Sequence, residues 1–181
     1  MEKSGMTETQ ERLLDKNTVD VVGDIDGEMA FYVRKAIMRL MVKGCPPIEI
    51  YISSNGGSVD YGLDIYDMFK LYKGEKTGIV IGIASSMAAV ILQACEKRKA
   101  TTHADILIHH ISQRDIKLDV LRDKNRLDEV IKSMEENQFF IYKILSDKTG
   151  KSIQAIKKEC AKDEPMTAKM SLQFGLIDQI I

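Results

Sequence analysis

Apolar residues along this chain show two kinds of spacing, one typical of strands and one typical of helices. Short β-branched or alternating runs predict strands at residues 19–22, 48–52, 78–83 and 106–108. Apolar residues three or four positions apart predict helices at residues 28–43, 87–94, 122–147 and 151–161, and one that starts at Val59. The tail from Gly175 predicts a turn and a last strand. Strands that alternate with helices favour an α/β fold with layered, mostly parallel strands and right-handed crossovers.

One domain is predicted to account for most of the chain. The length of 181 residues suits a single domain with a substantial core, and the sequence has no internal repeat or flexible linker. Residues 1–10 are polar and are expected to be disordered, so the domain is predicted over residues 11–181.

Charge and hydropathy exclude several classes of protein. The net charge of −1 gives no global attraction for nucleic acid or for an anionic membrane. The longest apolar stretch, residues 78–94, is interrupted by glycine, serine and glutamine, so it falls short of the ~20 apolar residues of a membrane helix. The N-terminus lacks the apolar run of a signal peptide. We therefore expect a soluble, cytoplasmic protein that binds neither nucleic acid nor a membrane.

The three cysteines are predicted to be free thiols. Cys45, Cys95 and Cys160 lie far apart in the sequence and form no CxxC pair. Their odd number and their spacing favour small buried or half-buried residues in a reducing compartment over disulfides or a zinc site. We expect no metal.

A serine at a strand-to-helix junction is the first candidate for chemistry. In GIASSMAA, residues 82–89, small side chains surround Ser86 just before a predicted helix. This is the setting of a nucleophile elbow, although the G-x-S-x-G spelling is absent. The positive end of the helix dipole would stabilise an alkoxide and a tetrahedral oxyanion there. The alternative is that Ser85 and Ser86 only cap the helix.

A glycine pair forms a second candidate. Asn55-Gly56-Gly57-Ser58 lies between a predicted strand and a predicted helix. Two glycines let the backbone turn sharply and bring its N–H groups close to a ligand, and the helix N-terminus adds a positive dipole. Such a loop can hold an oxyanion, although a plain turn has the same signature.

A histidine pair supplies a possible base. A serine nucleophile needs one, and the imidazole of His109 or His110 titrates near neutrality. His103 lies in a polar stretch. The alternative is a pair of surface or hydrogen-bonded histidines without a catalytic role. Spacing alone does not choose the carboxylate that would orient the imidazole; the candidates are Asp105, Asp115, Asp119, Asp163 and Asp178.

Five motifs resemble those of the Clp protease proteolytic subunit, in the family's order and at nearly its spacing. IYISSNGGSV (50–59) is similar to the family's YINSPGGSV, GLDIYD (62–67) to GLAIYD, and GIASSMAA (82–89) to GQAASMGA. LIHH (107–110) is similar to MIHQ, and DEPMTA (163–168) with FGLID (174–178) to DRFLSA and YGLID. The resemblance covers residues 48–181. It implies a ClpP/crotonase-like fold with a handle region at about residues 111–147 that contains a long helix.

The resemblance also implies roles for single residues. It assigns Ser86 as the nucleophile, His109 as the general base and Asp163 as the carboxylate that orients the base. The backbone N–H groups of Gly57 and Met87 would form the oxyanion hole. The implied activity is that of a serine endopeptidase that hydrolyses peptide bonds.

The family's partners follow from the same resemblance. Its subunits form a heptameric ring, or a tetradecamer of two stacked rings, that encloses the active sites. Such rings degrade peptides or unfolded proteins that an AAA+ unfoldase delivers. The subunit itself would need no cofactor, because ATP acts only through the unfoldase.

Two departures from the family pattern bear on assembly. The segment 111–122 lacks the glycines of the family's handle strand, which lines the substrate and joins two rings. Its alternating Ile116, Leu118 and Val120 leave either a strand or a longer helix open. Compared with the family, the N-terminus is short, and most of the apolar axial loop that helps meet the unfoldase is expected to be absent.

Three further departures lie near the candidate site. Asn55 stands where the family has proline, and Ala88 where it has glycine. His110-Ile111 stands in place of Gln-Pro, so the chain path after His109 is expected to differ. None of these changes removes a residue of the implied triad.

Two other functions remain open on the sequence. A crotonase-type CoA enzyme shares the fold and stabilises a thioester enolate with paired backbone N–H groups, which the Gly56-Gly57 loop would suit. The implied Ser/His/Asp set would then have no purpose. A non-catalytic ring subunit would assemble with an active paralogue, but inactive members usually lose a triad residue.

Overall fold

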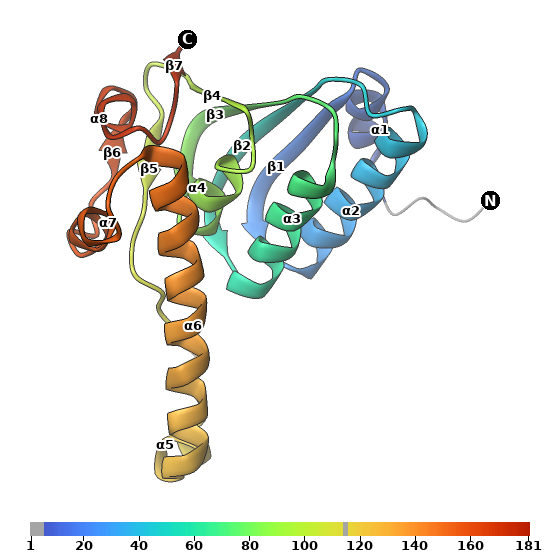
Figure 1. Ribbon diagram of the computed structural model, residues 1–181. Coiled ribbons are helices and arrows are strands. Elements are labelled where there is room, and N and C mark those ends of the chain that lie inside the picture. Colours follow the sequence, from blue (N-terminus) through green and yellow to red (C-terminus); the bar gives the residue numbers. More distant parts are fainter. Residues whose placement is uncertain (1–5, 114–115) are drawn as a thin grey trace.

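A mostly parallel sheet is the frame of the protein (Figure 1). Residues 6–113 and 116–181, which this computed structural model describes, form one sheet of seven strands. Strands β1, β2, β3, β4 and β7 follow one another in parallel, and β5 pairs in parallel with the end of β3. Only β6, which pairs with β5, is antiparallel within the described chain. The strands are β1 (Thr18–Ile25), β2 (Ile48–Gly57), β3 (Lys76–Ser85), β4 (Lys97–Ala100), β5 (Asp105–Leu107), β6 (Met166–Thr167) and β7 (Gln179–Ile180).

Some helices cover one face of the sheet, and others pack beside it at one side. Helices α2 and α3 lie against β1 to β3, and α6 to α8 lie on the side of β5 (Figure 1). The helices are α1 (Glu8–Asp15), α2 (Gly27–Val42), α3 (Val59–Leu71), α4 (Met87–Leu92), α5 (Leu118–Arg122), α6 (Lys124–Thr149), α7 (Ile153–Cys160) and α8 (Ala168–Phe174). Fully buried residues of strands and helices meet in the core; they include Val21, Ile50, Ile52, Val80, Val33, Ile37, Ile65 and Phe69. The predicted α/β fold with mostly parallel strands is confirmed.

The N-terminal helix differs from the prediction. Helix α1 begins at Glu8, inside the stretch 1–10 that was expected to be disordered. Thr7 and Gln10 form a capping box, in which each side chain accepts a hydrogen bond from the other residue's backbone N–H. Leu14 then packs into the core with no exposed surface. Residues 1–5 lie outside the described chain.

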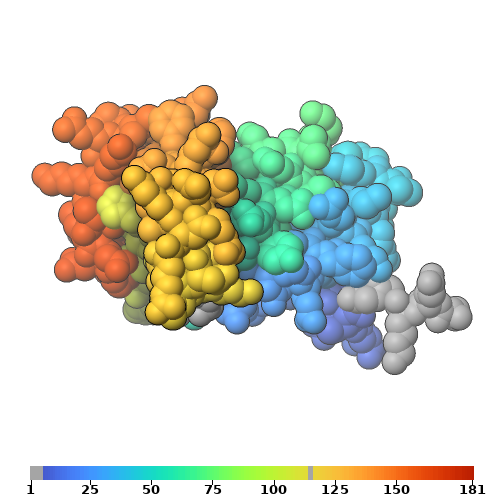
Figure 2. Space-filling model, turned by 90° about the horizontal axis from the view of Figure 1, so that it is seen from below, coloured from blue at the N-terminus to red at the C-terminus, as the bar shows by residue number. Residues whose placement is uncertain are grey.

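The handle region contains two helices and, over the described residues 116–123, no strand. Helix α6 extends beyond the sheet, and α5 lies at its far end (Figure 1). The sequence left open a strand or a longer helix here, and the structure has neither. Residues 118–122 form the short helix α5, and Asp123 leaves the helical conformation and separates α5 from α6. An ion pair of 2.8 Å between Asp119 and Arg126 holds the two helices together. In Figure 2, which views the molecule from below, this end (yellow) points toward the viewer.

Although α6 is the longest helix, none of the helices formed by the described residues is long and apolar enough to cross a membrane. The cysteines are free, as predicted: Cys95 and Cys160 are buried and Cys45 is half-buried. Burial raises the pKa of both the Cys95 and the Cys160 thiol to about 12, so both stay protonated.

Arg98 of β4 ties the last part of the chain to the sheet. Its guanidinium donates to the side chain of Gln93, just after α4, at 2.7 Å and to the carbonyl of Gly175 at 2.9 Å. It also forms a two-point contact with the carboxylate of Asp178, with distances of 3.1 and 2.5 Å. Burial alone would raise the pKa of Asp178, but the hydrogen bonds and charge of Arg98 outweigh it and lower that pKa.

This pair predicts a pH-dependent contribution to stability. Because the folded-state pKa of Asp178 lies below its unfolded value, the contribution is present above pH of about 4 and is lost as the pH falls through the folded pKa. We expect Asp178→Asn to lower the free energy of unfolding by about 1–3 kcal/mol at pH 7 and by less at pH 3. Thermal unfolding at both pH values measures this, with exposed Asp128→Asn as the control. A deficit equal at both pH values would contradict the assignment.

Candidate active site

The carboxyl ends of β2, β3 and β5 meet at one edge of the sheet. Ser54 of β2 pairs with Ala84 of β3, and Ser85 of β3 pairs with Leu107 of β5. Close to these pairs lie Gly56, which belongs to the end of β2 and pairs with Asp24 of β1, Ser86, which directly follows β3, and His109, which lies two residues after β5. Loops at the carboxyl ends of parallel strands are where α/β folds place their sites, and the register brings these three residues together.

Ser86 has a strained backbone. Its φ of 56° and ψ of −123° are unusual for a residue with a side chain. Such a conformation costs about 1–3 kcal/mol and persists only where the surroundings impose it. Here the Ser86 N–H donates to the carbonyl of Leu107 at 2.8 Å, and buried α4 begins immediately after. The hydroxyl makes no capping hydrogen bond to α4, so the alternative that Ser86 is only a helix cap is wrong.

Gly56, near the end of β2, lies directly against Ser86. A Cβ atom added to Gly56 would lie 2.6 Å from the Cβ of Ser86 and 3.2 Å from the nitrogen of Met87. Its φ of 93° also disfavours any side chain. The hydroxyl of Ser54 accepts a hydrogen bond from the Gly56 N–H at 3.0 Å and fixes the turn. Two backbones therefore touch at the point where Ser86 leaves its strand.

Two backbone N–H groups lie beside the serine. Met87 is the first residue of α4, so its N–H has no acceptor within the helix. Gly57 lines the same pocket as Ser86 and Met87, and a Cβ there would lie 2.3 Å from the carbonyl oxygen of Ile25. These are the groups that the resemblance assigns to an oxyanion hole.

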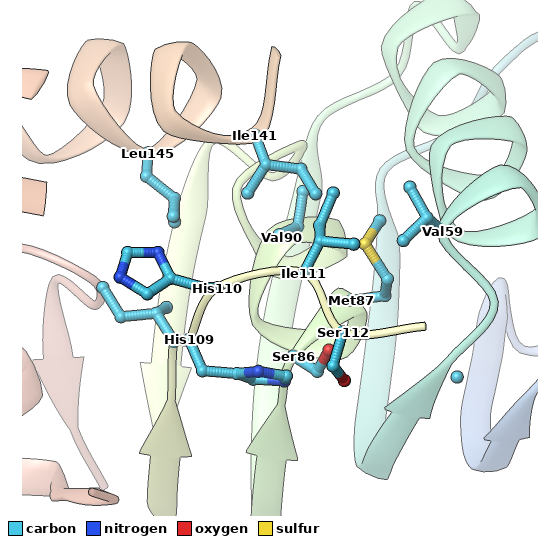
Figure 3. Close-up of a pocket in the computed structure, with 12 residues that line it drawn as sticks. Val59, Ser86, Met87, Val90, His109, His110, Ile111, Ser112, Ile141 and Leu145 are labelled. Atoms are coloured by element: carbon cyan, nitrogen blue, oxygen red, sulfur yellow. The ribbon is translucent and has the colours of Figure 1, made fainter. Parts of the chain in front are cut away.

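His109 extends toward Ser86 across this pocket (Figure 3). Its ring is half-buried, and within the described chain no hydrogen bond joins it to the Ser86 hydroxyl. His110 points the other way, and its Nδ1 lies 2.6 Å from the hydroxyl of Tyr142. The structure thus gives the two neighbouring histidines different surroundings, which the residue pattern alone did not distinguish and for which only the family resemblance had favoured His109.

Two of the candidate carboxylates are engaged elsewhere. Asp178 is held by Arg98 and Asp119 by Arg126, each in an ion pair. Neither faces the pocket that contains His109. Both are therefore poor candidates for orienting the imidazole.

Asp163 lies between α7 and β6. Its side chain is exposed, its φ is 52°, and among the described residues it has no hydrogen bond or ion pair. Asp105 lies within β5, opposite Thr167 of β6. Asp115 lies outside the described residues. The structure therefore joins no carboxylate of the described chain to His109.

Comparison with known proteins gives the family. A model of the Clp protease family matches residues 2–181. The ATP-dependent Clp protease proteolytic subunit 2 of Prochlorococcus marinus subsp. pastoris is 37% identical over 147 residues. That alignment covers 75% of this chain and spans 66% of the relative's length. The chain belongs to the Clp protease family.

An anchor to α6 follows the histidine in this Clp protease family member, and sequence reasoning missed it. Besides the contact of His110 with Tyr142, the N–H of Ile111 donates to the side-chain oxygen of Gln138 at 2.5 Å. Tyr142 and Gln138 lie four residues apart, so they share one face of α6. Burial, together with nearby Cys160, raises the pKa of Tyr142, so its hydroxyl keeps its proton at neutral pH. The four-residue spacing of these two polar side chains within an otherwise apolar stripe was the available signal.

The pocket beside Ser86 has an apolar wall in this member of the Clp protease family. Side chains from α3, α4 and α6 form it: Val59, Met87, Val90, Ile141 and Leu145 (Figure 3). Ser86, His109 and Ser112 supply its polar rim. The pocket suits an apolar group held next to Ser86.

The contact between Gly56 and Ser86 predicts a large effect of one methyl group. We expect Gly56→Ala to lower the free energy of unfolding by about 2–5 kcal/mol, since it adds backbone strain and a clash. Gly23→Ala is a matched control, because Gly23 has a φ of 99° and nothing within 4 Å of an added Cβ. The control should cost only the backbone strain, about 1–2 kcal/mol. Chemical denaturation of both variants measures the difference, and equal losses would show that the close contact is not there.

Proposed function

We propose that this chain is a serine endopeptidase of the Clp type. Ser86 is the nucleophile and His109 the general base. Asp163 orients the base, and the N–H groups of Gly57 and Met87 form the oxyanion hole. The observation that carries the proposal is the strained Ser86, whose hydroxyl caps nothing and which shares one pocket with the His109 ring that extends toward it.

The proposed reaction is acyl transfer in two steps. The Ser86 hydroxyl attacks the peptide carbonyl as His109 takes its proton, and the oxyanion accepts hydrogen bonds from Gly57 and Met87. His109 returns the proton to the leaving amine, and the C–N bond breaks. Water, deprotonated by His109, then attacks the acyl-enzyme and releases the acid product and Ser86.

The strand register supports Asp163 as the orienting carboxylate. In the antiparallel pair of β5 and β6, Asp105 lies opposite Thr167 and Ile106 opposite Met166, so the paired numbers sum to 272. Continued beyond β5 and β6, this register sets position 163 opposite position 109. The missing hydrogen bonds are compatible with a substrate-free site, in which catalytic hydrogen bonds are often long and tighten when substrate binds.

The pocket suggests the class of substrate. A peptide whose scissile carbonyl lies at Ser86 would place the preceding side chain against Val90, Ile141 and Leu145. An apolar side chain gains by leaving water there, whereas a carboxylate would lose its hydration without a partner. The proposed substrates are therefore peptides or unfolded chains cleaved after apolar residues.

The same proposal includes a ring of copies of this chain, with ATP used only by a partner unfoldase. Large apolar side chains are exposed on β1 and β3, at Val22 and Ile81, and on α6, at Phe139 and Phe140. Burying such groups stabilises an interface between subunits. The solution mass of the purified chain tests the ring.

Single substitutions test the proposed triad. We expect Ser86→Ala, His109→Ala and Asp163→Asn each to reduce hydrolysis of a fluorogenic peptide with leucine before the scissile bond by about 10⁴-fold or more. Melting temperatures should stay within a few degrees, because these side chains carry no structural hydrogen bond in the described chain.

Neighbouring residues of the same type provide the controls. Ser85→Ala, His103→Ala and Glu164→Gln should keep activity within a few-fold of the wild type. Full activity of Asp163→Asn would mean that another group orients His109. A wild type as inactive as Ser86→Ala would favour a non-catalytic ring subunit or a CoA enzyme instead.

A further inference from the structure

The segment that carries His109 has little support of its own. Residues 108–113 belong to no helix or strand. Residues 109–113 make no backbone–backbone hydrogen bond within the described chain. Two side chains of α6 make the hydrogen bonds that hold it, Tyr142 to His110 and Gln138 to Ile111. We call these four residues the α6 anchor.

Gln138 is oriented by this contact. Its side-chain oxygen faces the Ile111 N–H at 2.5 Å, while its side-chain nitrogen is buried without a hydrogen-bond partner in the described chain. Reversing the amide would set two donors against each other at Ile111. A buried unsatisfied donor costs free energy, so the geometry favours the bond to Ile111 over a better-satisfied amide.

Tyr142 is held rigidly as well. Its side chain is buried, its ring meets the His110 ring edge-on with centroids 6.0 Å apart, and the ammonium of Lys157 lies 5.4 Å from its centroid. Its hydroxyl can donate to an unprotonated Nδ1 of His110 or accept from a protonated one. The bond can therefore form in either protonation state of His110.

We propose that Tyr142 and Gln138 are positioning residues, which set the place of the His109 ring against Ser86 by fixing the two residues that follow it. The proposal rests on the serine peptidase function proposed above. His109 lies only two residues after the end of β5, so the strand fixes the position of the backbone that leads into His109. The α6 anchor fixes where the backbone goes next, and the two together set the direction of the ring.

Removal of one hydroxyl tests the anchor. We expect Tyr142→Phe to lower kcat about 10- to 100-fold and to change KM less than about threefold, since a small displacement of a catalytic group has effects of this size. Tyr72→Phe is the matched control, because it also removes a buried tyrosine hydroxyl that makes a hydrogen bond, here to the carbonyl of Pro46. Both variants should lose similar thermal stability, and only Tyr142→Phe should lose kcat.

The Gln138→Met variant is a second, independent test of the α6 anchor. It keeps the length of the side chain and removes the acceptor for the Ile111 N–H. Amide hydrogen exchange should become faster at Ile111, whose N–H bonds to Gln138, in Gln138→Met and in Tyr142→Phe, and stay unchanged in Tyr72→Phe. Hydrolysis by Gln138→Met should fall in kcat as for Tyr142→Phe.

The outcomes separate this inference from the proposed function. If the wild type shows no hydrolysis that depends on Ser86, the proposed function has failed, and the positioning role with it. If the wild type is active but Tyr142→Phe and Gln138→Met both keep its kcat, the anchor does not position the base. Loss of kcat by Tyr72→Phe equal to that by Tyr142→Phe would also overturn the inference, because the effect would then be general.

Discussion

The candidate site depends on one contact between two backbones, at Gly56 and Ser86. No side chain fits between them, since an added Cβ at Gly56 would lie 2.6 Å from that of Ser86. The contact brings the end of β2, with the N–H group of Gly57, to the start of α4. It also helps to hold Ser86 at a positive φ, a conformation that costs about 1–3 kcal/mol and needs such support. The proposed nucleophile and the N–H groups proposed to bind the oxyanion thus share one edge of the sheet because parallel strands end there together.

The second half of the site is built differently. His109 lies two residues after the end of β5. The residues that follow it are held by hydrogen bonds to Tyr142 and Gln138 of helix α6. The position of His109, the proposed base, therefore depends on side-chain hydrogen bonds to a helix, whereas that of Ser86 depends on backbone geometry. On this account, α6 contributes both the apolar wall of the pocket and the position of the base. Changes in α6 would then alter substrate binding and proton transfer together.

Periodicity predicted most of the fold because long elements bury a regular apolar face. Helices α2, α3 and α6 and strands β1 to β3 all lie within a few residues of their predicted bounds or reach beyond them. Some short elements were missed. One is β4, which has the sequence Lys-Arg-Lys-Ala and is a strand because its backbone pairs with β3. The small residues around Ser86 indicated a tight junction, but only the structure distinguishes an uncapped, strained serine from a helix cap. For the α6 anchor the sequence offered only the four-residue spacing of Gln138 and Tyr142, and their partners His110 and Ile111, which lie 32 and 27 residues away in the pairs formed, are not reported by hydropathy. Asp163 came from family resemblance alone, and the described contacts do not yet join it to His109.

The most direct test of the central claim is to react the purified chain with a fluorophosphonate and map the adduct by peptide mass spectrometry. Such a reagent marks a serine that a neighbouring base activates. The account predicts a single adduct, on Ser86, formed in the wild type and in Ser85→Ala and absent in Ser86→Ala. An adduct on Ser85 or Ser112, or none on the folded wild-type chain, would contradict it.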